Sequence, residues 1–198
     1  MPAATRPRRS ILYMPGSNSR ALEKARSLAC DGLILDLEDA VSPAAKDEAR
    51  QQVRAALNAG GYGARELVVR INPLDSDWGR EDLDTLSQCT LDAILLPKVS
   101  TPDQIHDLEQ RLNDLGYAPD CAIWAMMETP LGILNAQSLA ASTPRLACFV
   151  MGTNDLAKDL RLPPDADEAA FATSFGLSLL AARAYDLAII DGVYGALD

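Results

Sequence analysis

Histidine is almost absent from this 198-residue sequence, in which His106 is the only one. It lies in "TPDQIHDLEQRLNDL", where the pattern predicts a helix and places His106 among charged neighbours, so chemistry based on a histidine base is not expected. The sequence has four cysteines that are far apart and form no C-x-x-C pair: Cys30, Cys89, Cys121 and Cys148. Neither a thiolate metal site nor a disulfide framework is indicated, and we expect buried free thiols.

Basic residues are scarce as well, because 18 Lys and Arg stand against 28 Asp and Glu, giving a formal net charge of -10. A nucleic-acid groove or an anionic membrane surface requires basic residues on the protein, so neither is an expected partner. No apolar run approaches the about 20 residues that cross a bilayer, and the N-terminus lacks the apolar h-region of a signal peptide. We therefore expect a cytoplasmic protein.

What the sequence does contain is a regular alternation of short apolar runs with amphipathic, Ala-rich segments, which is typical of βα units around a parallel sheet. No linker interrupts the series, so residues 1–198 are predicted to form a single domain. Seven strands are predicted, at 10–16, 32–39, 67–72, 93–99, 121–129, 146–155 and 187–195.

Two architectures fit this alternation, an open doubly wound sheet and a (β/α)₈ barrel. No G-x-G-x-x-G follows the first predicted strand, which disfavours the dinucleotide-binding form of the open sheet. A barrel of this type usually needs about 250 residues, so a sequence that stops after its seventh strand is expected to lack the last βα unit.

The predicted helices have recognisable start and stop residues. After the second strand, Ser42 can accept an N-cap hydrogen bond with Pro43 at the first helical position, and Gly60 can end the helix. Thr101-Pro102 repeats this start before the helix that contains His106.

Alternation along the second strand separates its residues into two faces. Leu33, Leu35 and Leu37 are expected to pack under helices, which leaves Asp36 and Glu38 on the opposite face, the interior if the sheet is a barrel.

Charged residues occur near the carboxyl end of nearly every predicted strand, and in parallel α/β folds these ends share one edge of the sheet. In chain order the charged residues are Asp36, Glu38, Asp39, Arg70, Lys98, Glu128, Asp155 and Asp191. Buried carboxylates need cationic partners, and Arg70 and Lys98 are the obvious ones.

The six carboxylates of this set outnumber its two cations, which favours a bound divalent cation as a further positive charge. Without a histidine or a cysteine cluster the ligands would be oxygens, which indicates Mg²⁺ or Mn²⁺ rather than Zn²⁺. Glu128 and Asp155, each followed by a turn sequence, are the best candidates for the two protein ligands. Asp36 is equally well explained as a structural partner of a cation, and Asp191 as a turn residue.

Six motifs, in order and spacing, resemble the citrate lyase β subunit and its relatives in the HpcH/HpaI aldolase family over about the whole chain. They are "RSILYMPGSN", "LILDLEDAVSPAAKDEAR", "VVRINPLDSDWG", "ILLPKV", "METPLGILNA" and "MGTNDLAKDL". The resemblance implies a TIM-type (β/α)₈ barrel, here without its last βα unit. It also implies a Mg²⁺-dependent carbon–carbon lyase that cleaves a 3-hydroxyacyl thioester of the citryl, malyl or citramalyl type to an oxo acid and an acyl thioester.

The resemblance assigns roles to individual residues of this sequence. Glu128 and Asp155 would hold Mg²⁺, and Arg70 would bind a carboxylate of the oxo acid, such as oxaloacetate. Glu38 and Asp39 would orient water on the metal or assist proton transfer. The substrate pocket would also be lined by backbone groups near four residues: Pro130, Leu131, Gly152 and Thr153.

Two departures from the family pattern limit these expectations. The family continues into an eighth strand and terminal helices, and its members can draw an acidic residue from a neighbouring subunit, which suggests a homo-oligomer with a trimer favoured. Asn154 stands where the citrate lyase β subunit usually has Glu, so a relative is indicated, and coenzyme A and an acyl carrier protein both stay open as thioester partners. The alternatives are a metal-dependent pyruvate or oxo-acid aldolase and an inactive truncated subunit.

Overall fold

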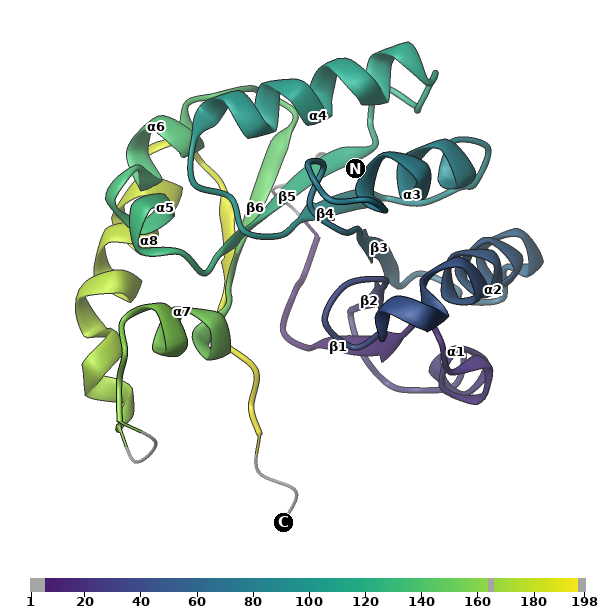
Figure 1. Ribbon diagram of the computed structural model, residues 1–198, viewed down its shortest axis with the longest axis horizontal. Coiled ribbons are helices and arrows are strands. Elements are labelled where there is room, and N and C mark those ends of the chain that lie inside the picture. The colour runs from purple at the N-terminus through teal and green to yellow at the C-terminus, as the bar shows by residue number, and fades with distance from the viewer. Residues whose placement is uncertain (1–5, 164–165, 196–198) are drawn as a thin grey trace.

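The computed structural model describes residues 6–163 and 166–195, and all seven predicted strands are present in them (Figure 1). The strands are β1 (Ile11–Pro15), β2 (Gly32–Asp36), β3 (Glu66–Arg70), β4 (Ala93–Leu96), β5 (Ala122–Met127), β6 (Leu146–Met151) and β7 (Ala188–Ile190). The α-helices are α1 (Ser19–Ala25), α2 (Lys46–Ala59), α3 (Gly79–Leu86), α4 (Pro102–Asp114), α5 (Pro130–Leu134), α6 (Ala136–Ala140), α7 (Thr153–Asp159) and α8 (Ala172–Ala184). Two 3₁₀ turns, η2 (Pro43–Ala45) and η3 (Glu168–Phe171), precede α2 and α8.

The order of the strands decides between the two architectures. Each strand pairs in parallel with the next one in the sequence, in the order β1-β2-β3-β4-β5-β6-β7. A doubly wound sheet reverses its strand order at a switch point, whereas a (β/α)₈ barrel keeps sequence order, so the fold is of the barrel type. Figure 1 shows the helices lying outside the curved row of strands. Seven strands of such a barrel are present in the described part of the chain.

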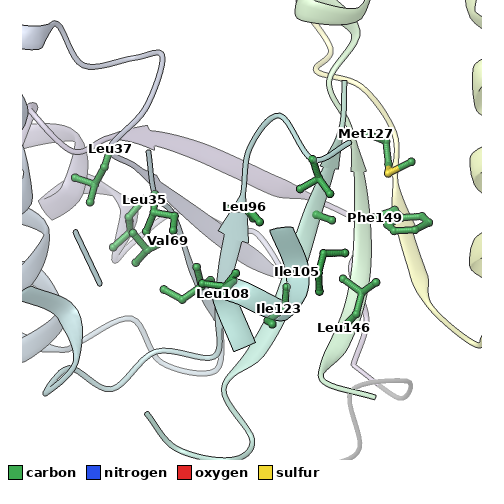
Figure 2. Close-up of a cluster of buried hydrophobic side chains, with 14 of the residues drawn as sticks. Leu35, Leu37, Val69, Leu96, Ile105, Leu108, Ile123, Met127, Leu146 and Phe149 are labelled. Atoms are coloured by element: carbon green, nitrogen blue, oxygen red, sulfur yellow. The ribbon is translucent and has the colours of Figure 1, made fainter. Parts of the chain in front are cut away.

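Two apolar clusters cover the two faces of the sheet. The outer cluster contains Leu33, Leu35 and Leu37 and joins the strands to the helices, as the alternation predicted, and Figure 2 shows part of it with Ile105 and Leu108 of α4 near the strands. The inner cluster is smaller and consists of Ile34, Val68, Ala93, Leu95, Trp124, Met126, Cys148 and Val150. The inner face is therefore apolar between its two edges, with the buried Arg8–Glu66 ion pair at the amino edge and Asp36 and Arg70 at the carboxyl edge.

The start of the helix after β2 differs from the prediction. Ser42 makes no side-chain cap hydrogen bond, and Pro43 begins the 3₁₀ turn η2 before α2 starts at Lys46. The Ser42 carbonyl instead accepts from the Ala45 N–H at 2.9 Å, so the tight turn satisfies the backbone without the hydroxyl. Gly60 ends α2 as predicted, with φ of 65°.

Several strands end earlier than the apolar runs predicted. The predicted strand 146–155 ends at Met151, and Asp155 lies in the first turn of α7. Glu128 directly follows β5. Glu128 and Asp155 therefore lie on the connections that follow β5 and β6, whereas Asp36 is the last residue of β2 itself.

The scarce residues behave nearly as expected. His106 is exposed on α4, and its Nε2 lies 2.9 Å from the Ser142 carbonyl oxygen. All four cysteines are free, two of them buried (Cys121 and Cys148) and two half-buried. Among the described residues, no helix has the length and apolarity that a membrane crossing requires.

Candidate active site

A cavity of about 340 Å³ opens at the carboxyl edge of the sheet, where the sequence placed the site. Its walls are Tyr13, Asp36, Asp39, Ala40, Arg70, Met126, Glu128, Met151, Gly152, Thr153, Asn154, Asp155 and Val193. A larger cavity of about 640 Å³ lies among residues that precede the strands, including Arg6, Asp31 and Arg65. Because sites of parallel α/β folds form at the carboxyl ends of strands, the smaller cavity is the candidate active site.

Arg70 and Asp36 form the buried base of this cavity. The register of β2 and β3 places them opposite each other, and the pair is bidentate, with Nε to Oδ1 at 2.7 Å and Nη2 to Oδ2 at 2.6 Å. Burial acts to lower the pKa of Arg70, but the hydrogen bond and charge of Asp36 overcome it and raise that pKa above its ordinary value. Asp36 also accepts from the backbone N–H of Glu38 at 2.9 Å and of Ala40 at 3.2 Å. One carboxylate therefore fixes both the guanidinium and the turn that carries Glu38 and Asp39.

Glu38 and Asp39 differ in their surroundings. Glu38 is buried, with Oε1 at 2.9 Å from Lys98 Nζ and Oε2 at 3.3 Å from Arg70 Nη1. Burial raises the pKa of Glu38, while the hydrogen bond of Lys98 and the charge of Arg70 act against that rise. Asp39 has a side chain that is 57% exposed, and its Oδ2 lies 3.7 Å from Arg70 Nη1. Asp39 is therefore the more accessible acid at the rim.

Lys98 connects the acids of three strand ends. Its Nζ lies 2.9 Å from Glu38 Oε1 and 2.5 Å from Asp155 Oδ2, and its backbone N–H donates to Glu128 Oε1 at 2.7 Å. Burial acts to lower the pKa of Lys98, but the hydrogen bonds to Asp155 and Glu38 raise it above the ordinary value. The side chain therefore stays an ammonium between the acids, in the role of cationic partner that the sequence analysis expected for it.

Glu128 is the most strongly perturbed acid of the site. It is 2% exposed, and burial raises its pKa to about 7, although the Lys98 N–H and the Lys98 charge act in the opposite direction. The charges of Glu38 and Asp155 raise that pKa further. Gly152 packs against this carboxyl, since a Cβ added there would lie 2.5 Å from Glu128 Oε2. A carboxyl held this way, in a cavity with other acids, is more readily ionised when a cation binds beside it.

The carboxylate oxygens of this cavity suit a Mg²⁺ ion better than a metal that takes all of its ligands from the protein. No group of three or more His, Cys, Asp or Glu that could hold a metal occurs in residues 6–163 and 166–195. Mg²⁺ commonly binds through one or two carboxylates and keeps water or substrate oxygens in its other positions. Glu128 and Asp155 supply two such carboxylates in one cavity, close enough for their charges to interact.

The remaining predicted residues are divided between the cavity and its surroundings. Gly152 and Thr153 line the cavity, whereas Pro130 and Leu131 begin α5 and do not appear among its described walls. Asp191 is exposed after β7, in a segment without an assigned turn, and its Oδ1 accepts from the N–H of Gly192 at 2.7 Å.

Residues that sequence reasoning did not single out also shape the site. The Tyr13 ring lies 5.1 Å from the Arg70 guanidinium carbon, and the Tyr13 hydroxyl donates to Met126 Sδ at 3.5 Å. Behind the β2 turn, Lys46 Nζ donates to the carbonyls of Leu37 and Glu38 at 2.7 and 2.8 Å. The sequence does contain a sign of this role for Lys46. The residue has the helical spacing of the buried face of α2, where an apolar residue is expected.

The chain is similar in sequence to known proteins. The profile of the HpcH/HpaI aldolase/citrate lyase family matches residues 9–198. A (3S)-malyl-CoA thioesterase of Cereibacter sphaeroides (strain ATCC 17025) is 50% identical over 190 residues, which cover 96% of this chain and 64% of that protein. The chain thus spans less than two thirds of the length of this curated relative.

Two solved structures have closely similar folds. The citrate lyase beta subunit of M. tuberculosis, complexed with oxaloacetate and magnesium, has a TM-score of 0.81 and 27% identity over 100% of this chain and 82% of that one. Protein CitE from Mycobacterium tuberculosis, in complex with magnesium, acetoacetate and coenzyme A, has a TM-score of 0.79 and 28% identity over 94% of this chain and 66% of that one. These similarities confirm the predicted barrel-type fold.

Proposed function

This chain belongs to the HpcH/HpaI aldolase/citrate lyase family, and on that premise we propose that it is a Mg²⁺-dependent carbon–carbon lyase. Its substrate would be a 3-hydroxyacyl thioester, cleaved to an oxo acid and an acyl thioester. The observation that carries the proposal is the single cavity that gathers Arg70, Glu128 and Asp155. Magnesium and oxo acids are bound by the two solved M. tuberculosis proteins, which supports this choice of cofactor and product.

In this proposal Glu128 and Asp155 hold the Mg²⁺ ion. When bound, the ion would supply Lewis-acid polarisation of the hydroxyl and carboxylate oxygens of the substrate. Asp36 grips the Nε and Nη2 side of Arg70 at 2.7 and 2.6 Å. The Nη1 side has only the longer contacts to Glu38 at 3.3 Å and Asp39 at 3.7 Å, so a substrate carboxylate would bind there in competition with them. A planar guanidinium grips a carboxylate with two parallel hydrogen bonds, so Arg70 would fix the oxo-acid half of the substrate.

Proton transfer falls to the acids of the β2 turn. Both Glu38 oxygens already have partners, namely Lys98 for Oε1 and the Asp39 N–H and Arg70 for Oε2. Asp39 is exposed at the rim and can exchange protons with solvent. We therefore assign Asp39 to accept the hydroxyl proton and Glu38 to position it. The C–C bond then breaks as the deprotonated hydroxyl oxygen forms the oxo group of the oxo acid, and the electron pair of that bond passes to the α-carbon of the thioester as an enolate. The proton taken up by Asp39 is then given to this α-carbon, which completes the acyl thioester.

The test is an assay of a 3-hydroxyacyl-CoA such as malyl-CoA, with Mg²⁺ and with EDTA. The Glu128→Gln and Asp155→Asn variants should lose Mg²⁺ binding in calorimetry and lose at least about a hundredfold in kcat, the scale of a removed metal or electrostatic contribution. Asp103→Asn, an exposed carboxylate on α4, is the matched control and should change neither. Wild-type Mg²⁺ affinity in either site variant would refute the ligand assignment.

A second candidate is hydrolysis of the thioester, favoured by the 50% identity to a malyl-CoA thioesterase. The two reactions have different products from malyl-CoA. Cleavage of the C–C bond yields glyoxylate and acetyl-CoA with no free thiol, while hydrolysis consumes water and yields malate and free coenzyme A. Trapping the oxo acid with phenylhydrazine and the thiol with a disulfide reagent separates them, and turnover of free hydroxy-oxo acids would instead support the aldolase alternative.

The proposal extends to partners and location. Coenzyme A is the preferred thioester carrier because the M. tuberculosis CitE structure contains it, while a carrier protein stays the alternative. A cytoplasmic location suits an enzyme of thioesters with four free cysteines. We propose a homo-oligomer, with a trimer favoured, and light scattering of the purified protein tests this.

A further inference from the structure

Lys98 has an unusual role in the cavity, because one residue contacts the acids of three strand ends. Its ammonium touches Glu38 and Asp155, and its backbone N–H binds Glu128, so it reaches both proposed metal ligands. No other role for Lys98 follows from the proposed reaction, in which it neither contacts the substrate carboxylate nor moves a proton.

The backbone at Lys98 is adapted to this double contact. Its φ is 53°, in the left-handed region that a non-glycine residue seldom adopts. The residue lies just beyond the end of β4, where this conformation accompanies an N–H bond to Glu128 and a side chain that reaches Glu38 and Asp155. Such strain persists only where the surroundings hold it, and it is concentrated at functional sites.

We propose that Lys98 is a positioning residue that sets the affinity of the site for a divalent cation. This inference rests on the proposed metal ligands Glu128 and Asp155. The Lys98 ammonium holds Asp155 next to Glu38 and neutralises part of the acid cluster. The same positive charge repels a Mg²⁺ ion that binds to Glu128 and Asp155. It therefore weakens Mg²⁺ binding and keeps the ion exchangeable.

The exposures of the partners support this competition. The side chain of Asp155 is 28% exposed and that of Lys98 is 41% exposed, so water reaches both partners and their contact can be exchanged. The Glu128 side chain accepts from the Lys98 backbone N–H, a donor that Met, Arg or Asn at this position would retain. Replacing the Lys98 side chain therefore changes the charge at the site and keeps one of the two ligands in place.

The test compares Lys98→Met with the wild type by calorimetric titration with MgCl₂. Removal of one unit charge a few ångströms from a divalent ion should tighten Mg²⁺ binding by about tenfold at a half-exposed site. Lys98→Arg keeps the charge and should bind Mg²⁺ like the wild type. Lys158→Met is the matched control, because Lys158 is an exposed lysine on α7 whose loss changes the net charge equally.

Two further measurements keep the inference open to refutation. In EDTA, Lys98→Met should melt below the wild type because the acids lose their internal cation, and Mg²⁺ should raise its melting temperature by more than it raises that of the wild type. If Lys98→Met does not fold, Lys98→Asn serves, since Asn tolerates the left-handed backbone. Unchanged or weaker Mg²⁺ affinity in the folded variant overturns the inference, whereas a wild type that binds no Mg²⁺ overturns the proposed metal site itself.

Discussion

The buried pair of Asp36 and Arg70 gives the sharpest prediction about stability. In Asp36→Asn the guanidinium loses its bidentate carboxylate, whose contacts are 2.7 and 2.6 Å long, in a place where the Asp36 side chain is 1% exposed and that of Arg70 is 9% exposed. Removing one partner of a buried ion pair typically costs about 3–5 kcal/mol, because the other charge stays buried without compensation. Glu38 still lies 3.3 Å from Arg70 Nη1 and compensates in part, so we expect a loss near the lower limit, about 3 kcal/mol.

Urea unfolding in EDTA, followed by the fluorescence of the buried Trp124, measures this loss. The midpoint should fall with an unchanged slope, and the melting temperature should drop by roughly 6–12 °C for a chain of this size. Asp39→Asn is the matched control: this carboxylate is exposed and 3.7 Å from the same guanidinium, so its loss should cost less than about 0.5 kcal/mol. A loss below about 1 kcal/mol in Asp36→Asn, with the slope unchanged, would refute the view that the pair is a buried structural support.

Two further predictions concern Glu128 and the glycine that packs against it, Gly152. Burial raises the pKa of Glu128 from 4.5 to about 7, so its protonated form contributes stability below pH 4.5 that is lost as the pH rises through 7. In EDTA the melting temperature of the wild type should therefore fall more than that of Glu128→Gln when the pH is raised from 5.5 to 8. Equal decreases in the two proteins would contradict the raised pKa. Gly152→Ala places a methyl group 2.5 Å from Glu128 Oε2, so Mg²⁺ affinity should fall by at least about tenfold. Gly176→Ala in α8, where a Cβ meets nothing within 4 Å, should instead raise stability by about 0.5–1 kcal/mol, and similar behaviour of the two alanine variants would refute the close-packing argument.

Much of the fold could be predicted because burial repeats along the sequence with the period of the structure. The two faces of β2 followed from alternation, and Leu35 and Ile34 indeed lie in different clusters. The choice between an open sheet and a barrel did not follow from the residues, because alternation shows which face is buried and not which strand lies next to which. The family resemblance supplied that choice, and the sequential strand order agrees with it.

The sequence allowed us to predict which charged residues of the site could pair, but not the geometry of their contacts. Convergence of strand ends predicted that Asp36 would pair with Arg70 or Lys98, and the register of β2 and β3 selects Arg70. The sequence could not show that Lys98 adopts a left-handed backbone, and the acids that it contacts there, Glu38, Glu128 and Asp155, come from distant parts of the sequence. The stacking of Tyr13 on Arg70 depends likewise on the packing of β1 beside β2 and has no local signal.

The ionic contacts of the site form two layers whose exposure determines what each can do. The inner layer is Asp36 with Arg70, which is buried and bidentate, so replacing either partner would leave a buried charge that is at best partly compensated. The outer layer is Lys98 with Asp155, which is partly exposed and held by one contact. A pair in contact with water loses little when it opens, because solvent replaces the partner. Ion or substrate exchange can therefore proceed in the outer layer while the inner layer keeps Arg70 in place, and this separation allows one small cavity to be both rigid and exchangeable.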